Sequence, residues 1–204
     1  MAAHDFKGWA FRSILAEVAV SIALALALSG CSSAPPSAVT SASAGATELN
    51  PPGDIPDTQA FVAVDVPNSR VTLKVPEGWS RTGGATATSF TDKLNRIEIQ
   101  VSTVTTPPSE ASIRAVDVPK LGQTTTKFAL GSISTVVRKG GSAILTTYQV
   151  DSAPDSVTGK VVRDAGERYT FVNGTTRVDL LLIAPTNADN VDPWRTVSDS
   201  VTFR

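Results

Sequence analysis

Histidine and cysteine are nearly absent from this chain, which has one of each in 204 residues. His4 and Cys31 both lie in the first 31 residues, so the rest of the chain has neither an imidazole nor a thiol. This absence excludes serine–histidine–aspartate and cysteine–histidine catalysis, histidine-ligated zinc sites and disulfide bonds from the part that folds. We therefore expect a conventional hydrophobic core, no catalytic residues, no bound metal and no cofactor.

An excess of charge of either sign is also missing. The chain has 18 basic and 19 acidic side chains, and residues 1–30 contain two of each sign. Such a balance gives no electrostatic argument for binding nucleic acid. The sequence has no phosphate-binding glycine loop of the P-loop type and no calcium loop, and the pair Gly83-Gly84 is typical of an ordinary loop.

Long apolar runs are missing too, and the longest, Val18–Leu28, has 11 residues interrupted only by Ser21. A permanent membrane-spanning helix needs about 20 apolar residues. The run instead fits the apolar region of a signal peptide, which follows the basic residues Lys7 and Arg12. It ends in Leu28-Ser29-Gly30-Cys31, the lipobox pattern of an aliphatic residue, two small residues and cysteine.

These features predict that residues 1–30 are a signal peptide and that Cys31 becomes an N-palmitoyl, S-diacylglycerol cysteine. Cysteine is required at this position because its thiolate is the nucleophile that accepts the lipid. The protein would then be anchored in the cell membrane, on its extracytoplasmic face. Two alternatives are an ordinary secretory signal, in which Cys31 has no role, and an uncleaved signal anchor.

The rest of the chain divides into two parts. Residues 31–57 are rich in Ser, Ala, Pro, Thr and Gly and have few large apolar side chains, so we interpret them as the lipidated cysteine followed by a disordered tether. Residues 58–204 have the size of one globular domain.

The first half of this domain shows strand patterns and one helix pattern. Alternating apolar and polar residues predict strands at 61–66, 71–75 and 96–101. Residues 109–121 favour a helix with Ser109 as its N-cap, and Pro119 is expected to end or kink it.

The second half is predicted to be an antiparallel meander. The strands are expected at 132–138, 142–150, within 160–172 and at 176–184. Lys139-Gly140-Gly141 and Asn173-Gly174 favour hairpins, and Asn173-Gly174 is the preferred dipeptide of a type I′ turn. Strand 176–184 is apolar on both faces, which favours a central place in the sheet.

A last helix is expected to begin with Asp192 as N-cap and Pro193 as first helical residue. Trp194, Val197 and Val201 would form its apolar stripe. The fold class predicted from these elements is α+β, with a single antiparallel β-sheet packed against at least two helices.

Candidate sites are few. Asp151, Asp155 and Asp164 stand near predicted turns, but nothing in their spacing brings two of them together as a glycosidase requires. Trp79 and Trp194 are expected in the core rather than against a ligand. The remaining candidates have ordinary structural explanations. They are the N-glycosylation pattern Asn173-Gly174-Thr175, interpreted as a turn, and the basic residues Arg138, Lys139 and Arg163, interpreted as solvated.

The chain resembles the mycobacterial LpqN/LpqT lipoprotein family. The resemblance lies in the lipobox Leu28–Cys31, the segments Phe61–Pro67 and Val71–Trp79, and the terminal segment Trp194–Val201, and it spans about residues 55–204. It implies a PsbP-like α/β sandwich on the outer side of the cytoplasmic membrane. It implies no established enzymatic activity and no catalytic motif, and members of the family are discussed as envelope or host-interaction factors.

The sequence therefore predicts a membrane-anchored, non-enzymatic binding module that assists cell-envelope transport or assembly. Its partner would be an envelope protein or a lipid or glycolipid, and not nucleic acid. One alternative is a surface lipoprotein that interacts with host proteins. The other is an envelope hydrolase that uses carboxylates alone.

Overall fold

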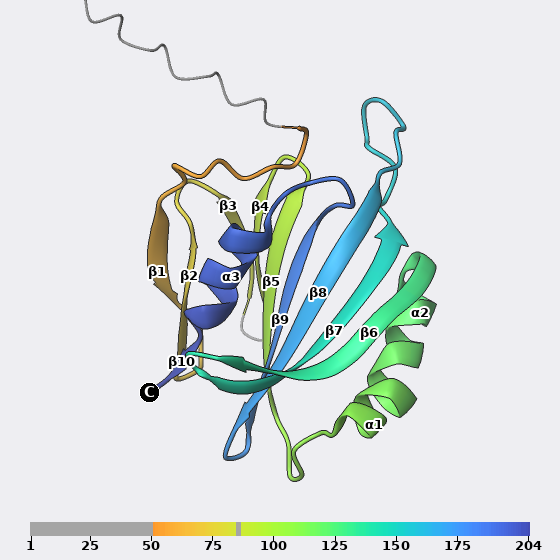
Figure 1. Ribbon diagram of the computed structural model, residues 1–204. Coiled ribbons are helices and arrows are strands. Elements are labelled where there is room, and N and C mark those ends of the chain that lie inside the picture. Colours follow the sequence, from red (N-terminus) through yellow and green to blue (C-terminus); the bar gives the residue numbers. More distant parts are fainter. Residues whose placement is uncertain (1–50, 85–86) are drawn as a thin grey trace, which may run out of the picture. The chain divides into compact units, whose positions relative to one another are not determined.

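The computed structural model describes residues 51–84 and 87–204, which form two antiparallel β-sheets and two helical regions (Figure 1). Cys31, the expected signal peptide and most of the expected tether lie outside the described residues. The strands are β1 (Phe61–Asp65), β2 (Val71–Pro76), β3 (Ser80–Gly83), β4 (Ala87–Asp92), β5 (Asn95–Thr103), β6 (Thr126–Arg138), β7 (Gly141–Asp151), β8 (Arg163–Asn173), β9 (Thr176–Pro185) and β10 (Thr202–Phe203). The helices are α1 (Glu110–Ser112), a π-helical stretch (Ile113–Asp117), α2 (Val118–Thr124) and α3 (Val191–Asp199). The fold is α+β as predicted, and predominantly β.

The larger sheet has seven strands in the order β3-β4-β5-β9-β8-β7-β6. Strand β9 lies at its centre, which confirms the position predicted from its two apolar faces. Its residues Val178, Leu180 and Leu182 are fully buried on one face, and Ile183 is 5% exposed on the other. A strand with neighbours on both sides and apolar residues on both faces loses both its unpaired edges and its exposed apolar surface.

The expectation of a single sheet is wrong, because β1, β2 and β10 form a separate three-stranded sheet. Strand β2 pairs with β1 and, through Thr72 opposite Thr202, with the C-terminal β10. Its residues Val71, Leu73 and Val75 are at most 2% exposed because they face the core of the larger sheet. A strand that packs face to face on another sheet is not available to extend that sheet's edge. Local alternation predicts such a strand but does not choose its partners.

The hydrophobic core lies between one face of the larger sheet and a layer made of the small sheet and α3. Tyr169 and Phe171 share the core face of β8 with ring centroids 6.3 Å apart. Trp194 of α3 is 6% exposed, and its ring contacts the partly buried Trp79 edge to face at 6.4 Å. The core role expected for both tryptophans is therefore confirmed.

The helix expected at 109–121 is present, but it continues through Pro119 to Thr124. Ser109 is its N-cap as predicted, since Ser112 N donates to Ser109 Oγ at 3.2 Å and Ser109 N donates to Ser112 Oγ at 2.8 Å. Pro119 stands in the first turn of α2, directly after the wider π-helical stretch. Proline is tolerated there because its missing N–H is not needed in a first turn. Of the two outcomes expected at Pro119, an end or a kink, the end is not observed, because the helix continues to Thr124.

Two further local predictions need correction. Helix α3 begins at Val191 with Asn190 as N-cap, so Asp192 lies in the first turn rather than at the cap. The last hairpin pairs Asn173 with Thr176, and of its two central residues only Gly174 has a positive φ, of 58°. That pattern is a type II′ turn, which places glycine first, and not the predicted type I′.

The folded body begins earlier than expected. Ile55 is 5% exposed in the core, and its N–H donates to Asn190 Oδ1 at 2.8 Å. The last residues of the segment interpreted as a tether therefore belong to the folded domain.

Candidate binding cavity

The second face of the larger sheet points away from the core and is covered in part by the helical region 110–124, which runs beside β6 (Figure 1). Two contacts fix this region to the sheet. Thr135 of β6 donates to Glu110 Oε1 at 2.6 Å, and Arg177 Nη2 of β9 lies 2.8 Å from Asp117 Oδ1. Beside the helical region the sheet remains open, and two adjacent cavities lie there.

The larger of these cavities has a volume of about 600 Å³ and is open to solvent. This volume is in the range of ordinary small-ligand sites. Its lining comes from the β4–β5 turn, strands β5, β7, β8 and β9, and the end of α2. The lining residues are Thr91, Lys93, Leu94, Asn95, Arg96, Glu98, Leu121, Thr124, Thr125, Thr126, Tyr148, Val150, Asp151, Ser152, Ala153, Asp164, Leu181 and Ile183. We refer to it as the β5–β9 cavity.

Tyr148 forms part of the wall of this cavity and packs closely on the sheet. Gly166 lies opposite it on β8, and a Cβ added at Gly166 would meet the tyrosine ring at 2.6 Å. The Phe128 ring lies 5.5 Å away, centroid to centroid. Only 3% of Tyr148 is exposed, and this burial raises its pKa from 10.0 to about 12. A glycine at position 166 is therefore needed for the ring to lie flat on the strand.

Three carboxylates and two basic groups give the β5–β9 cavity its charge: Glu98, Asp151, Asp164, Arg96 and Lys93. Burial raises the pKa of Asp164, and the positive charge of Arg96 partly opposes this rise. Glu98 lines the same cavity. Glu98 of β5 lies opposite Leu181 of β9, which lies opposite Arg168 of β8, and Asp164 is four residues before Arg168 on that strand. At ordinary strand spacing the Cα atoms of Glu98 and Asp164 are therefore about 16 Å apart. Paired glycosidase carboxyl groups lie only roughly 5–9.5 Å apart, so this pair does not match that arrangement.

The second cavity, of about 410 Å³, adjoins the first at Leu121 and Thr124 and has an ionic floor. Asp179 is its centre: its carboxylate accepts from Thr170 Oγ1 at 2.6 Å and lies 3.0 Å from Arg168 Nη2. Arg177 Nη2 donates to both Asp179 Oδ1 at 3.1 Å and Asp117 Oδ1 at 2.8 Å. Burial alone would lower the pKa of Arg177, but the two carboxylates outweigh it and raise the pKa.

Two of the three aspartates considered from sequence, Asp151 and Asp164, line the β5–β9 cavity on neighbouring strands, and the Asp151 charge adds to the rise of the Asp164 pKa. Asp155 is not part of that lining. Asp151 lies 2.8 Å from Lys127 Nζ and 3.1 Å from Arg163 Nη1, and Asp155 accepts hydrogen bonds from Val157 and Thr158 within its own loop. The hydrogen bond from Lys127 is the main reason that the pKa of Asp151 is lowered. Asp155 and Asp164 belong to no ion pair among the described residues, whereas Asp151 belongs to two.

Of the three basic residues expected to be solvated, Lys139 is exposed as predicted, whereas Arg138 and Arg163 are partly buried. Arg163 pairs with Asp151, and Arg138 lies over the Tyr169 ring at 4.9 Å from its centroid. Arg138 Nη2 donates to the Tyr169 hydroxyl at 2.9 Å, and that hydroxyl donates to Glu167 at 2.7 Å.

The sequence analysis missed the residues on the second face of the larger sheet, where the two cavities lie. Arg177 and Asp179 alternate with the buried Val178 and Leu180, which is a signal that the second face of this strand carries charge. The contribution of Tyr148 has no comparable signal, because its environment is created by Gly166 on another strand.

Both tyrosines of the chain are expected to resist ionisation. Burial raises the pKa of Tyr148 to about 12, and burial and then the Glu167 carboxylate raise the pKa of Tyr169. Since the folded-state pKa of Tyr148 lies above the unfolded value of 10.0, the contribution of this tyrosine to stability is complete below pH 10.0 and is lost as the pH rises from there toward about 12. The contribution of Tyr169 is lost in the same direction. Ultraviolet absorbance of tyrosinate in the folded protein is the measurement. If the tyrosines of the unchanged protein and of Tyr148→Phe both ionised with midpoints near pH 10.0, this expectation would be wrong.

No protein-family model and no curated protein matches the chain. Several solved structures are similar to it. The chain aligns with a crystal structure from Bacteroides thetaiotaomicron at 12% identity and a TM-score of 0.49, over 70% of this chain and 48% of that one, so it spans about half of that chain's length. LpqN of Mycobacterium tuberculosis, whose structure is described as involved in cell envelope biogenesis, is 16% identical with a TM-score of 0.44, over 72% of this chain and 91% of that one. The Ran-binding protein Mog1p of Saccharomyces cerevisiae is 14% identical with a TM-score of 0.42, over 64% and 79%.

None of the helices in the described part of the chain is long and apolar enough to cross a membrane. Within residues 51–84 and 87–204, no three or more histidine, cysteine, aspartate or glutamate side chains are grouped to hold a metal ion.

Proposed function

We propose that this protein is an extracytoplasmic lipoprotein, anchored in the cell membrane through lipid on Cys31, that works as a non-enzymatic binding module in cell-envelope transport or assembly. Membership of the LpqN/LpqT family and a PsbP-like arrangement of its layers belong to the same proposal. They are supported by the lipobox Leu28–Cys31 and by the segments Phe61–Pro67, Val71–Trp79 and Trp194–Val201.

The observation that carries the binding role is the chemistry of the β5–β9 cavity. Leu121, Leu181 and Ile183 give it apolar walls, while Arg96 and Asp164 give it charges. A ligand with an apolar part and a polar or sugar-like head finds both kinds of contact in such a cavity. We therefore propose a lipid or glycolipid as the occupant.

The cavity also lies where the tether would join the domain. Asn95 lines it, and Asn190 Nδ2 donates to Asn95 Oδ1 at 3.2 Å and to the Gly53 carbonyl at 2.9 Å. The start of the described chain and the β4–β5 turn lie at the same end of the molecule (Figure 1). Twenty residues separate Cys31 from Pro51, which is at most about 70 Å of chain. An anchor on Cys31 would therefore keep this end within reach of the membrane.

The test of the cavity is purification of the protein from membranes of its native host, followed by mass spectrometry of the lipids and glycolipids that remain bound. The unchanged protein should retain such a ligand, and Leu181→Asp should lose it because a carboxylate would be added to the apolar wall. Val137→Asp is the matched control, since Val137 is 74% exposed and lies outside the cavity lining. An unchanged protein free of ligand, or equal retention by both variants, would count against the proposal.

The anchor has a separate test. Cys31→Ala should accumulate as unprocessed precursor, because the lipid acceptor is gone. If that variant were processed and released like an ordinary secreted protein, the lipid anchor would be wrong while the cavity result would still stand.

A further inference from the structure

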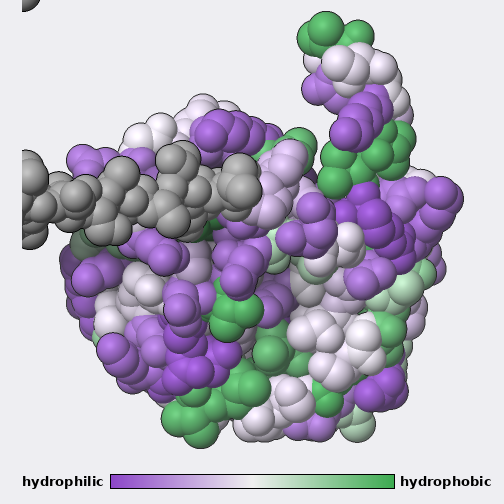
Figure 2. Space-filling model, turned by 45° about the horizontal axis from the view of Figure 1, so that its top comes forward, coloured by the Kyte–Doolittle hydropathy of each residue, from purple (hydrophilic) through white to green (hydrophobic). Residues whose placement is uncertain are grey.

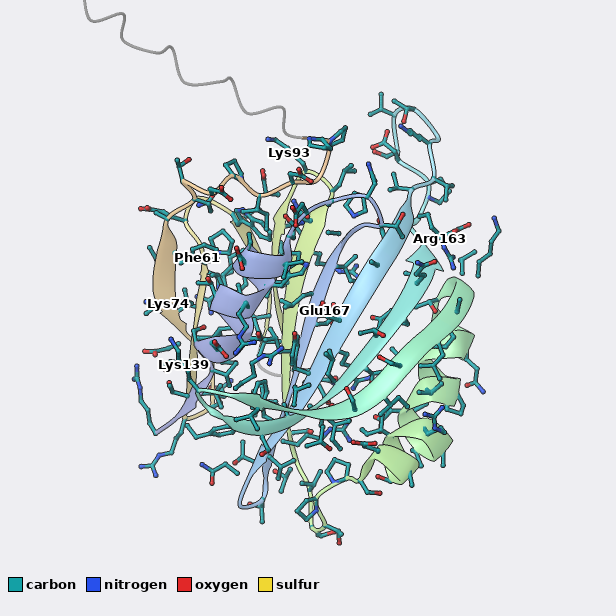
Figure 3. All side chains as sticks on the ribbon, in the orientation of Figure 1. Phe61, Lys74, Lys93, Lys139, Arg163 and Glu167 are labelled. Carbon is teal, nitrogen blue, oxygen red and sulfur yellow. The ribbon has the colours of Figure 1, made fainter. Side chains whose placement is uncertain are left out.

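A third cavity lies on the other side of the core, where the small sheet, the C-terminal end of α3 and the β6–β7 turn meet. Its volume is about 530 Å³. The lining residues are Ala63, Thr72, Leu73, Lys74, Lys139, Arg195, Thr196, Asp199, Ser200 and Thr202. We refer to it as the α3–β2 cavity. Lys74 and Lys139 lie beside α3 in Figure 3, far from Lys93 at the end where β4 turns into β5.

Three basic side chains from three different elements line this cavity. They are Lys74 of β2, Lys139 of the β6–β7 turn and Arg195 of α3. Among the described residues, no carboxylate lies within ion-pair distance of Lys74 or Lys139. Two ammonium groups held at one cavity without a counter-ion repel each other, and an anion bound between them removes that repulsion.

The one carboxylate of the lining is already neutralised. Asp199 Oδ2 accepts from Arg195 Nε at 2.9 Å, and its Oδ1 lies 3.9 Å from Arg138 Nε. Burial by itself would raise the pKa of Asp199, but the Arg195 hydrogen bond and the nearby positive charges outweigh it and lower the pKa. With Arg138 behind it, Asp199 leaves the cavity with a net positive charge.

The positions of the two lysines are fixed by the backbone. Lys74 N donates to Ser200 Oγ at 2.7 Å, which joins β2 to the end of α3. The β6–β7 turn is pressed against the same region, because a Cβ added at Gly140 would collide with the backbone oxygen of Val201. Lys139 directly precedes Gly140, so its main chain is held in place. The main chain is therefore fixed at both positions, and the exposed lysine side chains can turn toward an anion in the cavity.

We propose that the α3–β2 cavity is an anion site for a phosphate group, held by Lys74, Lys139 and Arg195. A phosphate monoester carries nearly two negative charges at neutral pH, which matches the two unpaired lysines, and lysine binds phosphate as a point charge. Ala63 and Leu73 also line the cavity, so it can hold a small apolar part next to the phosphate. The group can therefore be inorganic phosphate or the phosphate of a lipid headgroup. This site is separate from the β5–β9 cavity and does not depend on its role.

Two probes distinguish the sources: inorganic phosphate, measured by calorimetry, and phosphatidylcholine vesicles with or without phosphatidic acid, measured by sedimentation. All described contacts lie within residues 51–204, so a chain that starts at Ser32 keeps the described body and removes the anchor from the vesicle assay. Binding of inorganic phosphate identifies a free-anion site, and binding only to vesicles with phosphatidic acid identifies a headgroup site. Either affinity should fall as salt is raised.

Two double variants test whether the α3–β2 cavity binds these probes. Lys74→Gln/Lys139→Gln should weaken binding by at least about tenfold, since two charge-assisted contacts are lost. Arg114→Gln/Lys160→Gln removes two exposed basic side chains that line neither cavity and should bind like the unchanged protein, with all three proteins giving the same thermal unfolding curve. No binding of either probe by the unchanged protein, or an equal loss in both double variants, overturns the proposal.

Discussion

Asp179→Asn should lower the free energy of unfolding by about 3 kcal/mol or more, because it leaves two buried arginines with one carboxylate. The side chains of Arg168, Arg177, Asp117 and Asp179 are all between 8% and 16% exposed, so water replaces a lost partner poorly. Asp179 is the member that contacts both arginines within 3.1 Å. Asparagine keeps its shape and its hydrogen bond from Thr170 but removes the charge.

Urea denaturation followed by circular dichroism measures this loss. Asp92→Asn is the matched control, since Asp92 is exposed and belongs to none of the ion pairs of the described residues; it should change stability by less than about 0.5 kcal/mol. If Asp179→Asn were as stable as Asp92→Asn, the network would not contribute to folding.

A double-mutant cycle with Arg177→Gln separates charge pairing from packing. If the pair acts through its charges, the double variant should be less destabilised than the sum of the two single variants, because it no longer leaves Arg177 buried without Asp179. Additive losses would instead point to packing. Arg177 Nε lies 2.9 Å from Asp179 Oδ2 but makes no well-directed hydrogen bond there, so charge attraction is expected to dominate.

The network also limits what the smaller cavity does. The carboxylate oxygens of Asp117 and Asp179 are occupied by Arg168, Arg177 and Thr170. The floor of the smaller cavity therefore acts as the support that holds α1 and α2 against the sheet, beside the β5–β9 cavity.

Local sequence signals were sufficient for the elements whose structure depends on near neighbours. The central place of β9 followed from apolar residues on both faces, and the N-cap of the first helical region followed from Ser109 alone. The strands β3 and β4 were missed, because Ser80–Gly83 is fully exposed and Ala87–Asp92 is mostly polar. In these segments the pairing of β4 with β5 and of β3 with β4, and not a hydrophobic pattern, makes the strands.

The candidate sites depend on register, which no single segment specifies. Arg96, Tyr148 and Asp164 reach one cavity only because β5, β9, β8 and β7 pair in that order. Lys74 and Lys139 are 65 positions apart in the sequence and meet only because the small sheet packs face to face on the large one. The second sheet was the main error in the predicted fold, so the cavity it forms with α3 was not predictable either.

Asn190→Ala should lower the free energy of unfolding by about 3 kcal/mol, because one buried amide joins three separate segments. Asn190 is 3% exposed. Its Oδ1 accepts from Ile55 N at 2.8 Å, and its Nδ2 donates to the Gly53 carbonyl at 2.9 Å and to Asn95 Oδ1 at 3.2 Å. Alanine leaves all three groups buried without this partner, at about 1–3 kcal/mol each before relaxation. The expected relaxation is release of residues 53–55, which exposes Ile55.

Two measurements on the same variant separate local release from global loss. Limited proteolysis should cut Asn190→Ala near residues 53–55 at a rate well above that of the unchanged protein, and urea denaturation should show the lower stability. Asn187→Ala is the matched control, because Asn187 is exposed three positions earlier and no side-chain hydrogen bond to it is present among the described residues. Equal proteolysis of the two variants would mean that Ile55 and the core hold this segment without Asn190. Faster proteolysis of Asn190→Ala alone would mean that the Asn190 side chain holds residues 53–55 in place. The same amide contacts Asn95 at the β5–β9 cavity, so it would join the start of the folded domain to that cavity.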